Sequence, residues 1–66
     1  MDIFLNGEPR LLANSLTVAE LLQQLELAHR RLAVEINQEI IPRSTFASHC
    51  LQAGDRVEIV CAIGGG

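Results

Sequence analysis

The sequence has no lysine, no tryptophan and no tyrosine, and all five of its cationic side chains are arginines. A catalytic lysine that forms a Schiff base with a substrate is therefore excluded. A polymer in which the C-terminus of one copy is joined to a lysine amine of the next copy is excluded for the same reason. The chain must act without any lysine side chain.

Clustered positive charge and long apolar runs are also missing. The formal net charge is −3, and the arginines are spread along the chain apart from Arg30 and Arg31. Nucleic-acid binding needs clustered lysine and arginine opposite the phosphates, so we expect no nucleic-acid partner. No apolar stretch approaches the length that crosses a bilayer, so we expect no membrane partner.

The two cysteines, Cys50 and Cys61, are too far apart to form a CxxC pair. His29 and His49 do not complete a set of metal ligands with them. We therefore expect no metal site and no bound cofactor. The N-terminus does not have the pattern of a secretory signal, which predicts a cytoplasmic protein whose thiols stay reduced.

One residue type is abundant at the C-terminus, which ends in Gly64, Gly65 and Gly66. Glycine loses more conformational freedom on ordering than any other residue, so this tail adds nothing to a core. A slim strand can, however, enter a narrow active site and present its terminal carboxylate there. We expect a single domain over residues 1–63 and a flexible glycine tail over residues 64–66, with an idle frayed end as the alternative.

The first residues are typical of a β-hairpin. Apolar residues alternate along residues 1–5, which indicates a strand with one buried face. Asn6 and Gly7 both tolerate positive φ and form a strong hairpin signal, after which residues 8–12 return as a second strand. Pro9 cannot donate a ladder hydrogen bond, so this second strand is expected at a sheet edge.

A helix is expected to begin after Thr17. The Thr17 hydroxyl and the Glu20 carboxylate have the spacing of a capping box, in which each binds an amide of the first turn. The apolar stripe that follows fades near Leu27. Its members recur with helical spacing and should face a sheet: Val18, Leu21, Leu22 and Leu25.

The second half of the chain predicts three more strands and a short helical turn. The order of elements predicts an α+β protein with a mixed five-stranded sheet and one main helix packed on one face. The last strand would lie at the centre, parallel to the first, which is the β-grasp arrangement of ubiquitin-like proteins. The expected elements are strands at residues 32–36, 39–41 and 56–63, turns at 37–38 and 53–55, and an α-helical or 3₁₀ turn at 44–49 capped by Ser44.

With this order and this tail, the whole chain resembles the ThiS family, the sulfur carriers of thiamine biosynthesis. No single motif is specific, but all of them in order are. Three departures from the family pattern are Gln38 where many members have glycine, Phe46 where tryptophan is common, and Gly64 as a third terminal glycine. The segments that carry the resemblance are residues 5–7, 17–22, 34–37, 41–44, 51–59 and 65–66.

The resemblance implies a reaction cycle at Gly66. A ThiF-like adenylating enzyme would use ATP to join the Gly66 carboxylate to AMP. A sulfurtransferase or cysteine desulfurase system would replace AMP with sulfur, and a ThiG-like thiazole synthase would take sulfur from the resulting thiocarboxylate. Gly65 and Gly64 would thread the tail into these active sites. The chain would be a co-substrate that is monomeric when free, without catalytic residues of its own.

A docking surface is expected on the sheet. If the first and last strands are neighbours, Phe4, Val60 and Ala62 fall together on the face opposite the helix. Monomers seldom expose apolar clusters without a partner, although scattered surface apolar residues are also normal. Cys61 alternates to the opposite face and is expected to be a buried structural thiol.

Three other functions stay open at this stage. The small-subunit sulfur carrier of molybdopterin synthase has the same fold and tail chemistry, but its chains usually run longer. A protein-conjugating modifier would form an isopeptide adduct with a target. A β-grasp protein-binding module would keep its function after deletion of Gly65 and Gly66, whereas a carrier would lose it.

Overall fold

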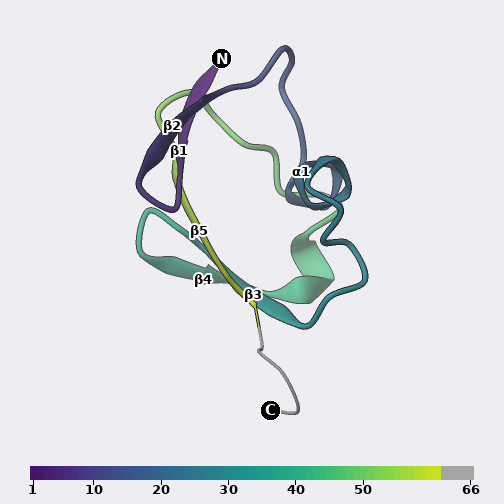
Figure 1. Cartoon of the computed structure of the whole chain (residues 1–66). Coiled ribbons are helices and arrows are strands. Elements are labelled where there is room, and N and C mark those ends of the chain that lie inside the picture. The colour runs from purple at the N-terminus through teal and green to yellow at the C-terminus, as the bar shows by residue number, and fades with distance from the viewer. Residues whose placement is uncertain (62–66) are drawn as a thin grey trace.

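Residues 1–61, which the computed structural model describes, form five strands, one α-helix and one 3₁₀ turn. Figure 1 shows α1 on one side of a curved sheet. The order of these elements matches the predicted order. They are β1 (Asp2–Leu5), β2 (Glu8–Leu11), α1 (Val18–Gln24), β3 (Leu32–Ile36), β4 (Glu39–Ile41), the 3₁₀ turn η1 (Arg43–Thr45) and β5 (Arg56–Cys61).

β5 lies at the centre of the sheet, whose strand order is β2-β1-β5-β3-β4. It is parallel to β1 and antiparallel to β3. β2, which contains Pro9, is an edge strand, as predicted. The structure therefore confirms the β-grasp arrangement. The predicted continuation of the last strand through residues 62–63 lies outside the described residues.

Hydrogen bonds from two directions satisfy the first turn of α1. Thr17 Oγ1 accepts from the Glu20 N–H at 3.1 Å, and Glu20 Oε1 accepts from the Thr17 N–H at 2.9 Å, which confirms the capping box. The N–H groups of Val18 and Ala19 donate to backbone carbonyls in the segment that follows η1. Two of the four amides that lack a partner within the helix at its start, those of Val18 and Ala19, thus tie this segment to the helix.

The helix ends at Gln24, before the apolar stripe fades. Glu26 has a φ of 60°, and its N–H donates to the carbonyl of Gln23 at 3.0 Å. The N–H of Leu27 donates to the carbonyl of Leu22 at 2.8 Å. These are the two bonds of a Schellman ending, in which glycine usually occupies the left-handed position. Here a glutamate occupies it.

The core lies between α1 and the inner face of the sheet. Ile3, Val34 and Val57 come from the three middle strands and are almost fully buried, as the predicted alternation of these strands requires. The segment after η1 closes one end of this core. The buried apolar residues are Ile3, Leu12, Val18, Leu21, Leu22, Val34, Ile36, Phe46, Leu51, Val57 and Ile59.

Three elements have boundaries that differ from the prediction. β1 begins at Asp2, one residue late, and β2 ends at Leu11, one residue early. The 3₁₀ turn covers Arg43–Thr45 in place of residues 44–49. The 3₁₀ turn is capped by Pro42, which has φ −63° and ψ 141° and makes no side-chain cap bond within the described chain. Ser44 lies inside the turn because the fixed φ of proline already suits its start. The Thr45 hydroxyl donates to the Pro42 carbonyl at 2.9 Å.

Candidate functional site

The candidate site is built around β5, because this strand leads into the glycine tail. The described residues do not include Ala62, Gly64, Gly65 or Gly66. What the structure describes is the strand that precedes the tail. β5 is the central strand of the sheet, and its side chains at Val57 and Ile59 are buried. The tail therefore follows directly from the central strand of the sheet.

Asn6 fixes β5 where β1 ends. Its backbone turns away with a φ of 50°, and its N–H donates to the carbonyl of Val57 at 2.8 Å. Its side-chain oxygen Oδ1 accepts from the N–H of Ile59 at 2.8 Å. The side chain thus takes the place that the next carbonyl of β1 would have occupied had that strand continued.

Asn37 fixes β5 from the other side, where β3 ends. Its N–H donates to the carbonyl of Arg56 at 2.9 Å, and its Oδ1 accepts from the N–H of Arg56 at 3.0 Å. Its Nδ2 donates to Oδ1 of Asp55 at 3.1 Å. The Asp55 carboxylate also accepts from the N–H of Gln52 at 2.8 Å, so the turn before β5 is closed by the same network.

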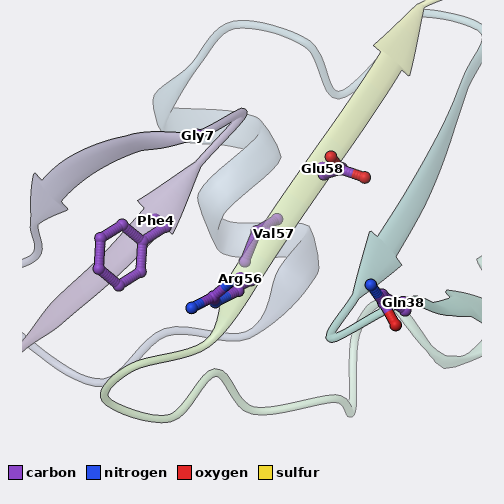
Figure 2. A pocket seen from close by; sticks show the side chains of 6 residues that line it. All are labelled: Phe4, Gly7, Gln38, Arg56, Val57 and Glu58. Carbon is purple, nitrogen blue, oxygen red and sulfur yellow. The ribbon is translucent and has the colours of Figure 1, made fainter.

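The outer face of the sheet carries a shallow hollow between these two turns. Figure 2 shows Gly7 on one side of β5 and Gln38 on the other, with Phe4 on β1 and Arg56 at the start of β5. The Arg56 guanidinium carbon lies 5.8 Å from the centroid of the Phe4 ring, within the range of a cation–π contact. The hollow measures about 380 Å³, and its lining residues are Phe4, Gly7, Gln38, Arg56, Val57 and Glu58.

The structure puts Phe4 and Val60 on the same face but not side by side. Phe4 is level with Arg56 in the parallel pairing of β1 and β5. Val60 lies four residues further along β5, which corresponds to roughly 13 Å at the usual rise per residue. Between these two levels, Glu58 faces Glu35 across the β3–β5 pair. Phe4 and Val60, the two predicted docking residues that the structure describes, therefore lie at two ends of a surface with two carboxylates between them.

Sequence reasoning missed several residues of this region. Leu11 and Ile40 are 76% and 74% exposed, more than Phe4, and strand alternation alone would have put both on the outer face. The bond from Asn6 to Ile59 had no sequence signal, because the two residues meet only through the register of β1 and β5.

The cysteines and histidines are not brought together as a catalytic group. Cys61 is half-buried and packs against the core, so it is less buried than predicted, whereas Cys50 is exposed. Within residues 1–61, no three His, Cys, Asp or Glu side chains are gathered as metal ligands. The same residues contain no helix long and apolar enough to cross a membrane.

A central strand that is parallel to the first strand, packed on one helix and followed by a glycine end, defines a β-grasp protein of the ubiquitin-like class. Within this class, residues 3–66 match the ThiS family. The chain is 39% identical to the sulfur carrier protein ThiS of Escherichia coli K12, over the full length of both. The chain therefore belongs to the ThiS family, as the sequence predicted.

A solved structure supports the same assignment. The crystal structure of a thiamine biosynthesis protein (ThiS) from Geobacter metallireducens superposes with a TM-score of 0.85 at 36% identity, and the match covers all of both chains. The comparison confirms the β-grasp fold over the length that the two proteins share.

A much longer relative contains the same unit. A thiazole synthase of Paramagnetospirillum magneticum is 46% identical over all 66 residues of this chain. The chain spans only 20% of that protein's length. In that relative, a region similar to this chain is therefore covalently part of a protein named for thiazole synthesis.

Proposed function

We propose that the chain is a sulfur carrier of thiamine biosynthesis and that the sulfur is carried on the carboxyl group of Gly66. The observation that supports this most directly is the full-length match to the E. coli protein named as a sulfur carrier. The terminal glycine pair on which the chemistry depends is present here as Gly65 and Gly66.

The proposed chemistry follows from the low reactivity of a carboxylate. An oxygen of the Gly66 carboxylate attacks the α-phosphorus of ATP, and pyrophosphate leaves. The acyl adenylate is a strong electrophile, so hydrosulfide, or the terminal sulfur of a donor persulfide, attacks its carbonyl carbon, a C–S bond forms and AMP leaves. Where the donor is a persulfide, a second thiol then cleaves the S–S bond of the acyl disulfide and is itself oxidised to a disulfide. The resulting thiocarboxylate carries a nucleophilic sulfur atom that is covalently attached to the protein. The chain is thus a co-substrate, and its partners supply the catalytic groups.

The proposed partners each act on the same end of the chain. A ThiF-like enzyme adenylates Gly66, and a sulfurtransferase or cysteine desulfurase system delivers the sulfur. A ThiG-like thiazole synthase receives it, which fits the relative in which a similar unit and a thiazole synthase share one chain. No cofactor is bound to the carrier in this scheme, ATP is consumed by the activating enzyme, and the cycle takes place in the cytoplasm.

Intact mass spectrometry tests this function. The chain is incubated with ATP, an adenylating enzyme of the ThiF class and a sulfur source, with the E. coli carrier as a positive control for enzyme activity. We expect replacement of one oxygen by sulfur at Gly66. A variant without Gly66 should show no change. An unchanged mass of the full chain beside a modified control would contradict the proposal and favour a β-grasp binding module.

The outer face is proposed as the docking surface for the activating enzyme. Phe4 is 40% exposed and lies beside Arg56 in the lining of the hollow, with Val60 further along the same face. We expect Phe4→Asp to lower the adenylation rate at least tenfold. Leu11→Asp is the matched control, because Leu11 is 76% exposed on the same face at the sheet edge. Equal rates for both variants, with both folded, would remove Phe4 from the docking surface.

A further inference from the structure

β5 has an open backbone edge along its second half. β1 pairs with β5 only at the levels of Arg56 and Val57, because the chain turns away at Asn6 and Gly7. On the opposite side, β3 accompanies β5 from Val57 to Cys61. Figure 2 shows β5 running on past the end of β1, and Figure 1 shows that β1 and β2 lie beside its first part. Among residues 1–61, no strand is paired with this side of β5 beyond Val57.

The backbone groups that point to this edge follow from strand alternation. The carbonyl of Val57 and the N–H of Ile59 both bond to Asn6. The backbone N–H and C=O groups of every second residue of β5 therefore point toward the side on which β1 lies. The carbonyl of Ile59 and both backbone groups of Cys61 must then point the same way. Asn6 caps the first donor of this edge, and the groups after it remain available for a strand.

We propose that an extended segment of thiazole synthase pairs with this edge and adds a strand beside β5, in line with β1. The inference rests on the proposed function. An enzyme that takes sulfur from Gly66 must hold residues 62–66 directly beyond Cys61, and five extended residues reach only about 17 Å. A strand pairing at Ile59 and Cys61 fixes both the direction and the depth at which the tail enters the enzyme.

Two observations favour thiazole synthase as the occupant. The relative from P. magneticum joins a similar unit to a thiazole synthase in one chain, which keeps the two units in one molecule. The side chains beside the edge, Glu58 and Val60, differ in character, so they offer no uniform apolar or charged surface. Pairing through backbone hydrogen bonds gives affinity without such a surface, as in strand addition to a sheet edge.

The shortness of the edge argues against a second copy of the chain as its occupant. Exposed edges invite self-association, and proteins limit this by keeping them short or blocked. Here Asn6 blocks the N–H of Ile59, and only Ile59 and Cys61 offer free groups within the described strand.

Cys61→Pro and Cys61→Ala form a matched pair that tests the edge. Both remove the thiol, but only proline removes the Cys61 N–H, which faces the open side and makes no bond to β3. Proline is tolerated at such an edge position. We expect Cys61→Ala to bind a thiazole synthase that lacks a fused carrier domain within about twofold of the unmodified chain. Cys61→Pro should bind at least tenfold more weakly, about 1.4 kcal/mol. Equal affinities for the two folded variants would overturn the proposal.

Hydrogen exchange in the unmodified chain tests the edge even where the proline variant is destabilised. The Cys61 amide should exchange much more slowly in the saturated complex with thiazole synthase than in the free chain. The amide of Ala53, in the turn far from the edge, should not change. No added protection at Cys61 in a saturated complex would overturn the proposal. Thiocarboxylate formation, followed by mass in the same samples, shows separately whether the sulfur-carrier function holds.

Discussion

The two hairpin turns that flank β5 use the same device with different residues. Both begin with an asparagine in the left-handed region, Asn6 at φ 50° and Asn37 at φ 52°. In each turn the asparagine Oδ1 accepts a hydrogen bond from a backbone N–H of β5. The following residue differs, because Gly7 has a φ of 84° and Gln38 a φ of 70°. Only the first turn has the residue that this conformation favours.

The comparison separates two roles that a turn sequence can combine. The asparagine positions a distant strand, and the second residue only has to reverse the chain. The first role is more demanding at Asn6, where the bond to Ile59 is partly buried, than at Asn37, where both side-chain bonds are exposed. Gly7 is better suited than Gln38 to reversing the chain, since a side chain at positive φ is strained.

Asn6→Ala should have the largest effect on stability. It leaves the partly buried Ile59 N–H without its acceptor, which costs about 1–3 kcal/mol, and it places alanine at positive φ. We expect a loss of about 2–3 kcal/mol in the free energy of unfolding, measured by urea denaturation. Asn6→Asp keeps an acceptor and tolerates the backbone, so it should recover most of the loss. An alanine variant as stable as the parent would mean that the Asn6 bond contributes nothing.

Asn37→Ala should cost less, about 1–2 kcal/mol, because the bonds it removes are exposed. The aspartate substitution separates the two turns. Asn37 donates to the Asp55 carboxylate at 3.1 Å, so Asn37→Asp would place two carboxylates together and should not restore stability at neutral pH. Urea denaturation of Asn6→Asp and Asn37→Asp measures this contrast directly. Recovery by aspartate in both turns would show that the Asp55 contact has no energetic importance.

Gly7→Ala tests the second position of the better turn. A Cβ at Gly7 would meet no heavy atom of the described chain within 4 Å, so any cost comes from the backbone and not from a clash. A left-handed alanine costs about 1 kcal/mol, which for a domain of this size lowers Tm by roughly 4–8 °C. Thermal denaturation followed by circular dichroism measures it. An unchanged Tm would mean that the turn relaxes to another conformation.

The contrast between the turns also shows what could be predicted from sequence. Asn6 and Gly7 predicted a hairpin because both residue types tolerate positive φ, and Pro9 placed β2 at the edge because proline cannot donate a ladder bond. The capping box at Thr17 was visible for the same local reason. Each of these signals depends on residues within a few positions of one another.

Features that depend on register could not be predicted in this way. Alternation assigned Phe4 and Val60 to one face, but their separation along β5 depends on the pairing of Phe4 with Arg56. The bond between Asn6 and Ile59 joins residues 53 positions apart and also follows from that pairing. The open edge of β5 exists because β1 is short relative to β5, which is a relation between two distant segments.

Gln38→Gly should have the smallest effect and the opposite sign. It relieves a side chain at φ 70° and restores the asparagine–glycine pair that suits such a turn. We expect a gain of about 0.5–1 kcal/mol in the free energy of unfolding, seen as a higher urea midpoint with an unchanged slope. Gln38→Ala keeps a Cβ at the same φ and should show no comparable gain. If alanine stabilised the protein as much as glycine does, the strain would arise from the glutamine side chain in the hollow and not from the backbone. The turn would then differ from the Asn6 turn in its contacts rather than in its conformation.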